Sequence, residues 1–116
     1  MKTFLKSVGF ALNGIRLAWA GKNFRIQCII GIVVITSGIM FRINTYEWLW
    51  IITMIGLVLA AEMVNSAIEN IVNFISPDFH PLAGKIKDIS AGAVLILSLT
   101  SIVTGLIIFV PYLNIF

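Results

Sequence analysis

Residues 48 to 75 read WLWIITMIGLVLAAEMVNSAIENIVNFI, and this stretch decides the fold. Its first half is almost entirely hydrocarbon and starts with Trp48 and Trp50, whose rings favour a membrane–water interface. Because about 20 apolar residues let a helix cross a bilayer, the stretch is long enough to cross and to protrude. Its strongly polar side chains gather in the second half, at Glu62, Asn65, Ser66, Glu69, Asn70 and Asn73. The sequence therefore predicts a spanning helix with a polar extension.

Two more apolar stretches flank the central one. The earlier stretch carries almost no charge after Arg25 and stops where Arg42 follows. The later stretch becomes apolar after Asp88 and ends before Pro111. Pro77 separates it from the central stretch, because proline cannot continue a helix. We therefore predict an all-α fold with three membrane-spanning helices, at about residues 24–41, 48–75 and 85–110.

Residues 1–22 show a different pattern. Apolar side chains recur there at spacings of three and four, whereas the lysine and arginine residues lie largely on other faces. This periodicity predicts an amphipathic helix that lies on the membrane surface. Its apolar face comprises Phe4, Leu5, Val8, Leu12, Ile15 and Trp19. Because charged residues interrupt the segment, it does not resemble a cleaved secretory signal, and we expect it to be retained.

The composition supports a single membrane domain. Of the 116 residues, 59% are hydrophobic and only 11% are charged, which excludes an ordinary water-soluble fold. The net charge is +3, but the eight basic residues are thinly spread. This distribution favours anionic lipid headgroups over nucleic acid as a partner. Cys28 has no second cysteine to pair with, so we expect it only to pack.

The basic residues also orient the spans, because short cytoplasmic loops collect lysine and arginine. Arg42 stands alone on one side of the membrane. The other side has Lys2, Lys6, Arg16, Lys22, Arg25, Lys85 and Lys87. We therefore expect the N-terminus and the loop between the second and third spans to be cytoplasmic, and the C-terminus to face outward.

The polar residues of the second span form a stripe along one helix face. Asn65, Glu69 and Asn73 follow Glu62 at offsets of three, seven and eleven. An ionisable group at membrane depth costs about 2.5 to 3.5 kcal/mol, so two carboxylates there require a reason. One reason is hydrogen bonding between helices that holds an oligomer together.

A second reason comes from the cytoplasmic start of the third span, where Lys85, Lys87 and Asp88 lie on the same side of the membrane as Glu69. Carboxylate oxygens bind magnesium and a lysine ammonium neutralises phosphate charge. A deeper carboxylate such as Glu62 is suited to take a proton from a lipid hydroxyl. The stripe therefore suggests phosphoryl transfer to a lipid.

Three segments carry a family resemblance: EMVNSAIE at residues 62–69, DFHPLAGKIKD at 78–88 and SAGAVL at 90–95. They resemble the prokaryotic diacylglycerol kinase and undecaprenol kinase family, whose signature is Glu-x-x-Asn-[Ser/Thr]-Ala-Ile-Glu, then a Lys-Asp pair and a helix start of small residues. The similarity covers nearly the whole chain. It implies a homotrimeric, ATP-dependent lipid kinase of the bacterial inner membrane, with active sites at subunit boundaries near the cytoplasmic face.

The resemblance also implies roles for individual residues. Glu62 matches the catalytic base, and Asn65 matches the polar residue beside it, which we assign to nucleotide binding. Glu69 matches a ligand of Mg2+. The nucleotide, ATP, is expected to contact Lys85, Lys87 and Asp88.

Three positions depart from the family pattern. Gly21 stands where a second metal-binding glutamate is usual, Asn73 replaces an aspartate, and Thr3 replaces an arginine. These departures leave open a catalytically weakened member of the family. They concern the metal site and the rate rather than the fold.

Alternatives from other functional classes remain at this stage. A proton-coupled transporter would explain Glu62 but not the gathering of Glu69, Lys87 and Asp88 at one water interface. A pore-forming or scaffolding protein would need none of them. For a kinase, the acceptor is undecaprenol or diacylglycerol, and the third span, over residues 102–111, favours the polyprenol. His80, in a loop, is expected to be a surface residue.

Overall fold

The computed structural model describes residues 1–113, and this part of the chain is helical apart from short connections. The helices are α1 (Lys2–Ala18), α2 (Lys22–Phe41), α3 (Thr45–Ile75) and α4 (Pro81–Phe109), followed by the 3-10 helix η1 (Val110–Leu113). The expected outward position of the C-terminus falls on residues 114–116, which lie outside the described residues.

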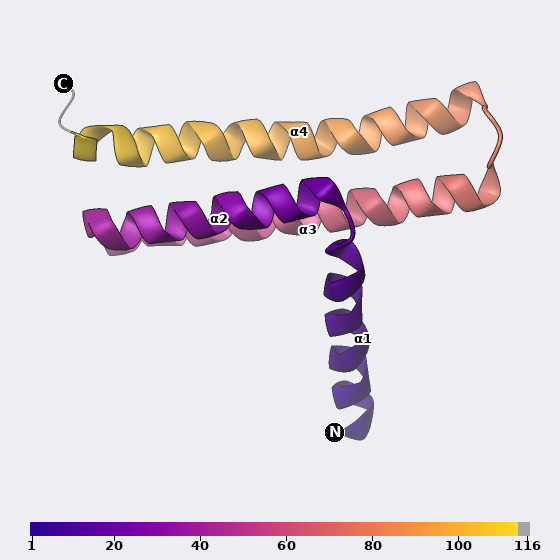
Figure 1. The fold of residues 1–116 in the computed structure, drawn as a ribbon, viewed down its shortest axis with the longest axis horizontal. Helices are drawn as coiled ribbons and strands as arrows, with labels where there is room; N and C mark the ends of the chain where they lie inside the picture. The colour runs from indigo at the N-terminus through magenta and orange to yellow at the C-terminus, as the bar shows by residue number, and fades with distance from the viewer. Residues whose placement is uncertain (114–116) are drawn as a thin grey trace.

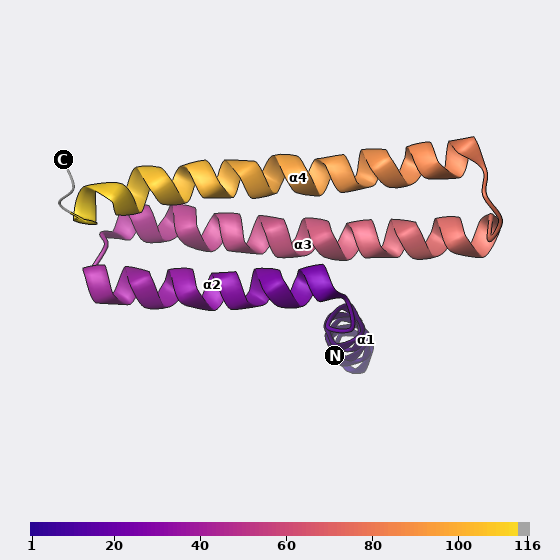
Figure 2. The ribbon, with the colours of Figure 1, turned by 45° about the horizontal axis from the view of Figure 1, so that its top comes forward.

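Helices α2, α3 and α4 form an antiparallel bundle, and α1 projects away from it at a steep angle (Figure 1). Helix α3 packs mainly on α4 and less extensively on α2. The 31 residues of α3 extend about 46 Å at 1.5 Å per residue, against about 30 Å for the hydrocarbon core of a bilayer. The α3–α4 hairpin therefore continues well past the start of α2, as Figure 2 shows.

Three helices in the described residues are long and apolar enough to cross a membrane, and they begin at Lys22, Thr45 and Pro81. Many of their large apolar side chains are exposed, including Ile32, Leu57 and Leu99. Such a surface suits hydrocarbon rather than water. The structure thus confirms the predicted all-α architecture of a short N-terminal helix and three spans.

All three spans begin earlier than the apolar pattern indicates, and local hydrogen bonds explain the two larger differences, at α3 and α4. The Asn44 side chain accepts a hydrogen bond from the Glu47 amide at 2.9 Å, and the Asn44 amide donates to Glu47 Oε1 at 3.0 Å. This capping box starts α3 at Thr45 rather than near residue 48. His80 Nδ1 accepts from the Leu82 amide, and Pro81 occupies the first turn of α4, which therefore starts before residue 85.

The end of the bundle opposite the α3–α4 loop holds its apolar core, which is built on Ile43, Ile51 and Ile108. The Tyr112 hydroxyl donates a hydrogen bond to Glu47 there and ties η1 to the start of α3. Gly38 lets α2 approach α3 closely, since a Cβ at this position would lie 2.8 Å from the Trp48 ring. These contacts fix the three spans side by side.

Candidate active site

The polar stripe of α3 lies where α2 begins and where the α3–α4 hairpin continues alone. Glu62 is 17 positions after Thr45, or about 25 Å along the helix, which puts it near one edge of a 30 Å hydrocarbon core. Glu62 and Asn65 are each only 6% exposed. The stripe therefore runs from a buried carboxylate toward water.

Two polar side chains of α2 lie near the buried Glu62. The Gln27 and Asn23 side chains lie close to its carboxyl group, and Glu69 is near enough to act on it through its charge. Asn23 lies in the first turn of α2, and Gln27 lies one turn further into the span. Amide groups of a second helix, α2, therefore lie beside the carboxylate at this depth.

Asn65 and Glu69 are joined by a hydrogen bond. Asn65 Nδ2 donates to Glu69 Oε1 at 3.2 Å. Asn65 Oδ1 is buried and accepts no hydrogen bond from any residue between 1 and 113. A buried polar atom without a partner is unusual in a native structure and calls for an explanation, such as a water molecule, an ion or a ligand that it binds.

Lys87 connects α4 to the stripe. Its Nζ atom donates a hydrogen bond to Asn73 Oδ1 at 2.5 Å, one helical turn beyond Glu69. A cation from the third span therefore reaches the same face that carries both carboxylates. The predicted convergence of the second and third spans is found for this lysine.

Lys85 and Asp88 take other positions on α4. Both side chains are exposed. At about 100° per residue, Lys85 is about 200° and Asp88 about 100° away from Lys87 around the helix. Within one chain, neither residue faces the stripe as Lys87 does.

Sequence comparison with known proteins matches this chain to one family. Residues 9–109 match the family described as prokaryotic diacylglycerol kinase. The chain belongs to this family. Undecaprenol kinase of Bacillus subtilis is 35% identical over 97% of the chain and 93% of its own length. Diacylglycerol kinase of Escherichia coli K12 is 29% identical over 90% of the chain and 86% of its own length.

A third relative, diacylglycerol kinase of Helicobacter pylori J99, is 33% identical over 82% of the chain and 75% of its own length. The chain thus matches these lipid kinases over most of their length. Membership of the prokaryotic diacylglycerol kinase family identifies this protein as a membrane-embedded lipid kinase.

The diacylglycerol kinase family implies magnesium, and the side chains here fit a metal that arrives with the nucleotide. Among residues 1–113, no three His, Cys, Asp or Glu side chains cluster closely enough to hold a metal ion. Magnesium commonly needs only one or two carboxylates besides substrate phosphates and water. The partly exposed Glu69 and the unsatisfied Asn65 Oδ1 are suited to this shared binding.

The family departures have visible structural consequences. Asn73 holds Lys87 through a neutral amide rather than a carboxylate. Gly21 precedes the first residue of α2 with ordinary extended backbone angles, φ −77° and ψ 131°, so the position does not require glycine. A Cβ there would lie 3.3 Å from the Ala18 carbonyl oxygen, which is tight but needs only a small shift.

The sequence pattern did not single out Gln27. A lone amide in an apolar run is ordinarily a packing residue, and periodicity within α2 does not show which helix it faces. Its position one helical turn after Asn23, another amide near the start of the same span, was the available signal.

Proposed function

We propose that this lipid kinase transfers the γ-phosphoryl group of ATP to the hydroxyl of undecaprenol or diacylglycerol at the cytoplasmic face of the bacterial inner membrane. The observation that carries the proposal is the stripe itself. It joins a buried carboxylate, Glu62, to a water-exposed end that Lys87 reaches from α4. A lipid hydroxyl and a nucleotide in water can meet only at such a boundary.

Glu62 acts as the general base. Its carboxylate takes the hydroxyl proton of the lipid while the hydroxyl oxygen attacks the γ-phosphorus and the bond to ADP breaks. Its buried position keeps bulk water away from the reacting oxygen, and water would otherwise compete as the acceptor. Amide groups of Gln27 and Asn23 from α2 lie beside the carboxyl group.

Glu69, Asn65 and Lys87 hold the nucleotide end. Magnesium bound with ATP would supply positive charge to the phosphates there, and Glu69 would be its protein ligand. The Lys87 ammonium neutralises further phosphate charge from the α4 side. Its bond to Asn73 keeps the ammonium over the stripe before the nucleotide arrives.

Lys85 and Asp88 are expected to act from a neighbouring subunit. They point away from the stripe of their own chain, so a homotrimer in which α4 borders another subunit would bring them to the next site. The exposed apolar surface of the spans leaves ample room for such packing. This arrangement assigns nucleotide contacts to both faces of α4.

The acceptor assay tests this function directly. Purified protein in mixed micelles receives radiolabelled ATP and magnesium, with undecaprenol or diacylglycerol in separate reactions. We expect label in one lipid, and the polyprenol is favoured by the relative that is 35% identical over 97% of the chain. Label in neither lipid, with protein that is folded by circular dichroism, would contradict the proposal.

Magnesium titration tests the role of Glu69. We expect Glu69→Gln to raise the magnesium concentration for half-maximal rate by about tenfold or more, since even residues that only hydrogen-bond to metal ligands carry about 10- to 100-fold in metal affinity, and a direct ligand should carry at least as much. Asp78→Asn is the matched control, because this carboxylate lies exposed in the α3–α4 loop. Equal titration curves for the two variants would remove Glu69 from the metal site.

A further inference from the structure

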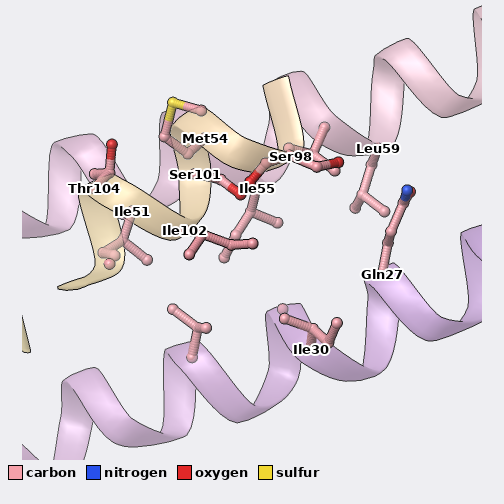
Figure 3. Close-up of a pocket in the computed structure, with 14 residues that line it drawn as sticks. Gln27, Ile30, Ile51, Met54, Ile55, Leu59, Ser98, Ser101, Ile102 and Thr104 are labelled. Atoms are coloured by element: carbon pink, nitrogen blue, oxygen red, sulfur yellow. Dashed lines mark hydrogen bonds between the residues drawn. The ribbon is translucent and has the colours of Figure 1, made fainter. Parts of the chain in front are cut away.

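A groove runs between α2, α3 and α4 in the interior of the bundle. Its volume is about 220 Å3 and its walls are mostly apolar. Figure 3 shows that Ile51 and Thr104 lie toward one end, whereas Gln27, Leu59 and Ser98 lie toward the other. The walls are thus mostly hydrocarbon, and the Gln27 amide lies at the end that approaches Glu62, whereas the hydroxyl groups of Ser101 and Thr104 donate hydrogen bonds to carbonyl oxygens of α4 itself.

The groove is shaped for a lipid chain with a polar head. Along α2 it extends from Gln27 to Val34, which is about 10 Å at 1.5 Å per residue. It runs parallel to the helices, and a chain lying in it would have the direction of the lipid chains around the protein. The end that carries Gln27 is on the side of the site, because Gln27 lies beside the Glu62 carboxyl group.

Gln27 has an unfulfilled hydrogen-bonding capacity at this point. Its Oε1 atom is buried and has no hydrogen-bond partner in the described part of the chain. A buried carbonyl oxygen left in this way costs free energy that a bound donor recovers. The donor must reach it through the groove, which Gln27 lines.

We propose that Gln27 Oε1 accepts a hydrogen bond from the hydroxyl of the lipid acceptor, and that the first carbons of the acceptor chain lie in the groove. This inference rests on the proposed function. It makes Gln27 a substrate-positioning residue that distinguishes an alcohol from a lipid without a free hydroxyl. It also places the hydroxyl group at the same depth in the membrane as the Glu62 carboxyl group.

The chemistry follows from rotation about the C–O bond of the alcohol. In the bound state the hydroxyl proton points to Gln27. For reaction it turns to Glu62, which takes the proton as the oxygen forms its bond to phosphorus and ADP leaves with the electron pair of the broken P–O bond. The product oxygen carries no proton, so Gln27 no longer holds it, and release of the phosphorylated lipid is favoured.

Binding of paired ligands tests the role of Gln27 without turnover. Farnesol and 1,2-dioctanoylglycerol are each compared with their methyl ethers, by calorimetry in micelles without ATP. We expect the wild type to bind at least one alcohol about tenfold more tightly than its ether, because a site built for a hydroxyl rejects the analogue that lacks it. In Gln27→Met, which keeps the length of the side chain, the ratio should fall to about one.

A ratio near one for both pairs in the wild type, or a ratio that survives in Gln27→Met, would overturn the inference. A matching thermal unfolding midpoint shows that Gln27→Met is folded. Failure of the proposed function is a separate result, since it appears as absence of labelled lipid in the acceptor assay. Kinetically, Gln27→Met should raise KM for the lipid about tenfold and leave KM for ATP unchanged.

A second variant tests the groove independently of hydrogen bonding. Gly105 lines the groove from α4, and a Cβ there would meet no atom within 4 Å, so Gly105→Leu fills the groove without a backbone clash. We expect it to weaken alcohol and ether binding equally, by about tenfold, and to preserve their ratio. Val103→Phe, on an exposed face of α4, is the control. Unchanged affinities in Gly105→Leu would place the chain elsewhere and contradict the inference.

Discussion

Replacing Lys87 by methionine removes a charge at the water end of the polar stripe and keeps the length and apolar stem of the side chain. The lost contact within the protein is one hydrogen bond to Asn73, on a side chain that is partly exposed. At this exposed position water can replace either partner, so the bond contributes only about 1 kcal/mol, less than a hydrogen bond to a charged group that is shielded from water, and the variant should fold with nearly the stability of the wild type.

The effect on the nucleotide should be larger. Hydrogen bonds to charged groups contribute about 1.5 to 3 kcal/mol, which at 1.4 kcal/mol per tenfold is a factor of about 10 to 150. We therefore expect Lys87→Met to lower kcat/KM for ATP by a factor in this range. KM for the lipid should stay within about twofold, because Lys87 lies two turns or more from the buried end.

Lys6→Met makes the matched comparison, because Lys6 has no assigned role at the nucleotide end. Lys6 is exposed on α1, and exposed ion pairs contribute about 0 to 1 kcal/mol, or at most about fivefold. The assay is lipid phosphorylation at varied ATP for both variants, with thermal unfolding in the same detergent. Equal losses for Lys6→Met and Lys87→Met, or a larger loss for Lys6→Met, would refute the assignment of Lys87 to the nucleotide site.

Two further predictions concern glycines. Gly38→Ala should destabilise the fold by about 1 to 3 kcal/mol, because its Cβ would lie 2.8 Å from the Trp48 ring. Gly56→Ala is the control, because its Cβ would meet no atom within 4 Å. A thermal unfolding midpoint of Gly38→Ala at or above that of Gly56→Ala would contradict this packing. Gly21→Glu should raise activity or magnesium affinity by restoring the carboxylate usual in the family, and unchanged magnesium dependence would show that the site takes its ligands elsewhere.

The spans were predictable because hydrocarbon is their solvent. Long apolar runs leave few other structures for the backbone, so the sequence indicates α2, α3 and α4 without knowledge of their contacts. The starts of α3 and α4 were not predictable from hydropathy. They depend on hydrogen bonds from Asn44 and His80, which are polar residues outside the apolar runs.

The relative placement of the candidate site residues was predictable on α3 and only partly on α4. Glu62, Asn65 and Glu69 share a face by spacing alone, and the structure leaves them together. To predict that Lys87 faces the stripe and Lys85 does not, one must know how α4 is rotated about its axis relative to α3. The sequence pattern does not give this rotation, and it did not show that α4 starts at Pro81. The position of Gln27 at the site could not be predicted from its own helix, because only the packing of α2 against α3 puts it next to Glu62.

The central claim is that one buried carboxylate performs the proton transfer while separate groups hold the nucleotide. Glu62→Gln separates the two, with nucleotide binding measured by equilibrium dialysis with labelled ATP and magnesium, and turnover measured as label in the lipid. We predict that turnover falls by about 100- to 10,000-fold while the dissociation constant for ATP changes by less than about threefold. Turnover within tenfold of the wild type, or loss of ATP binding in parallel with turnover, would contradict the account.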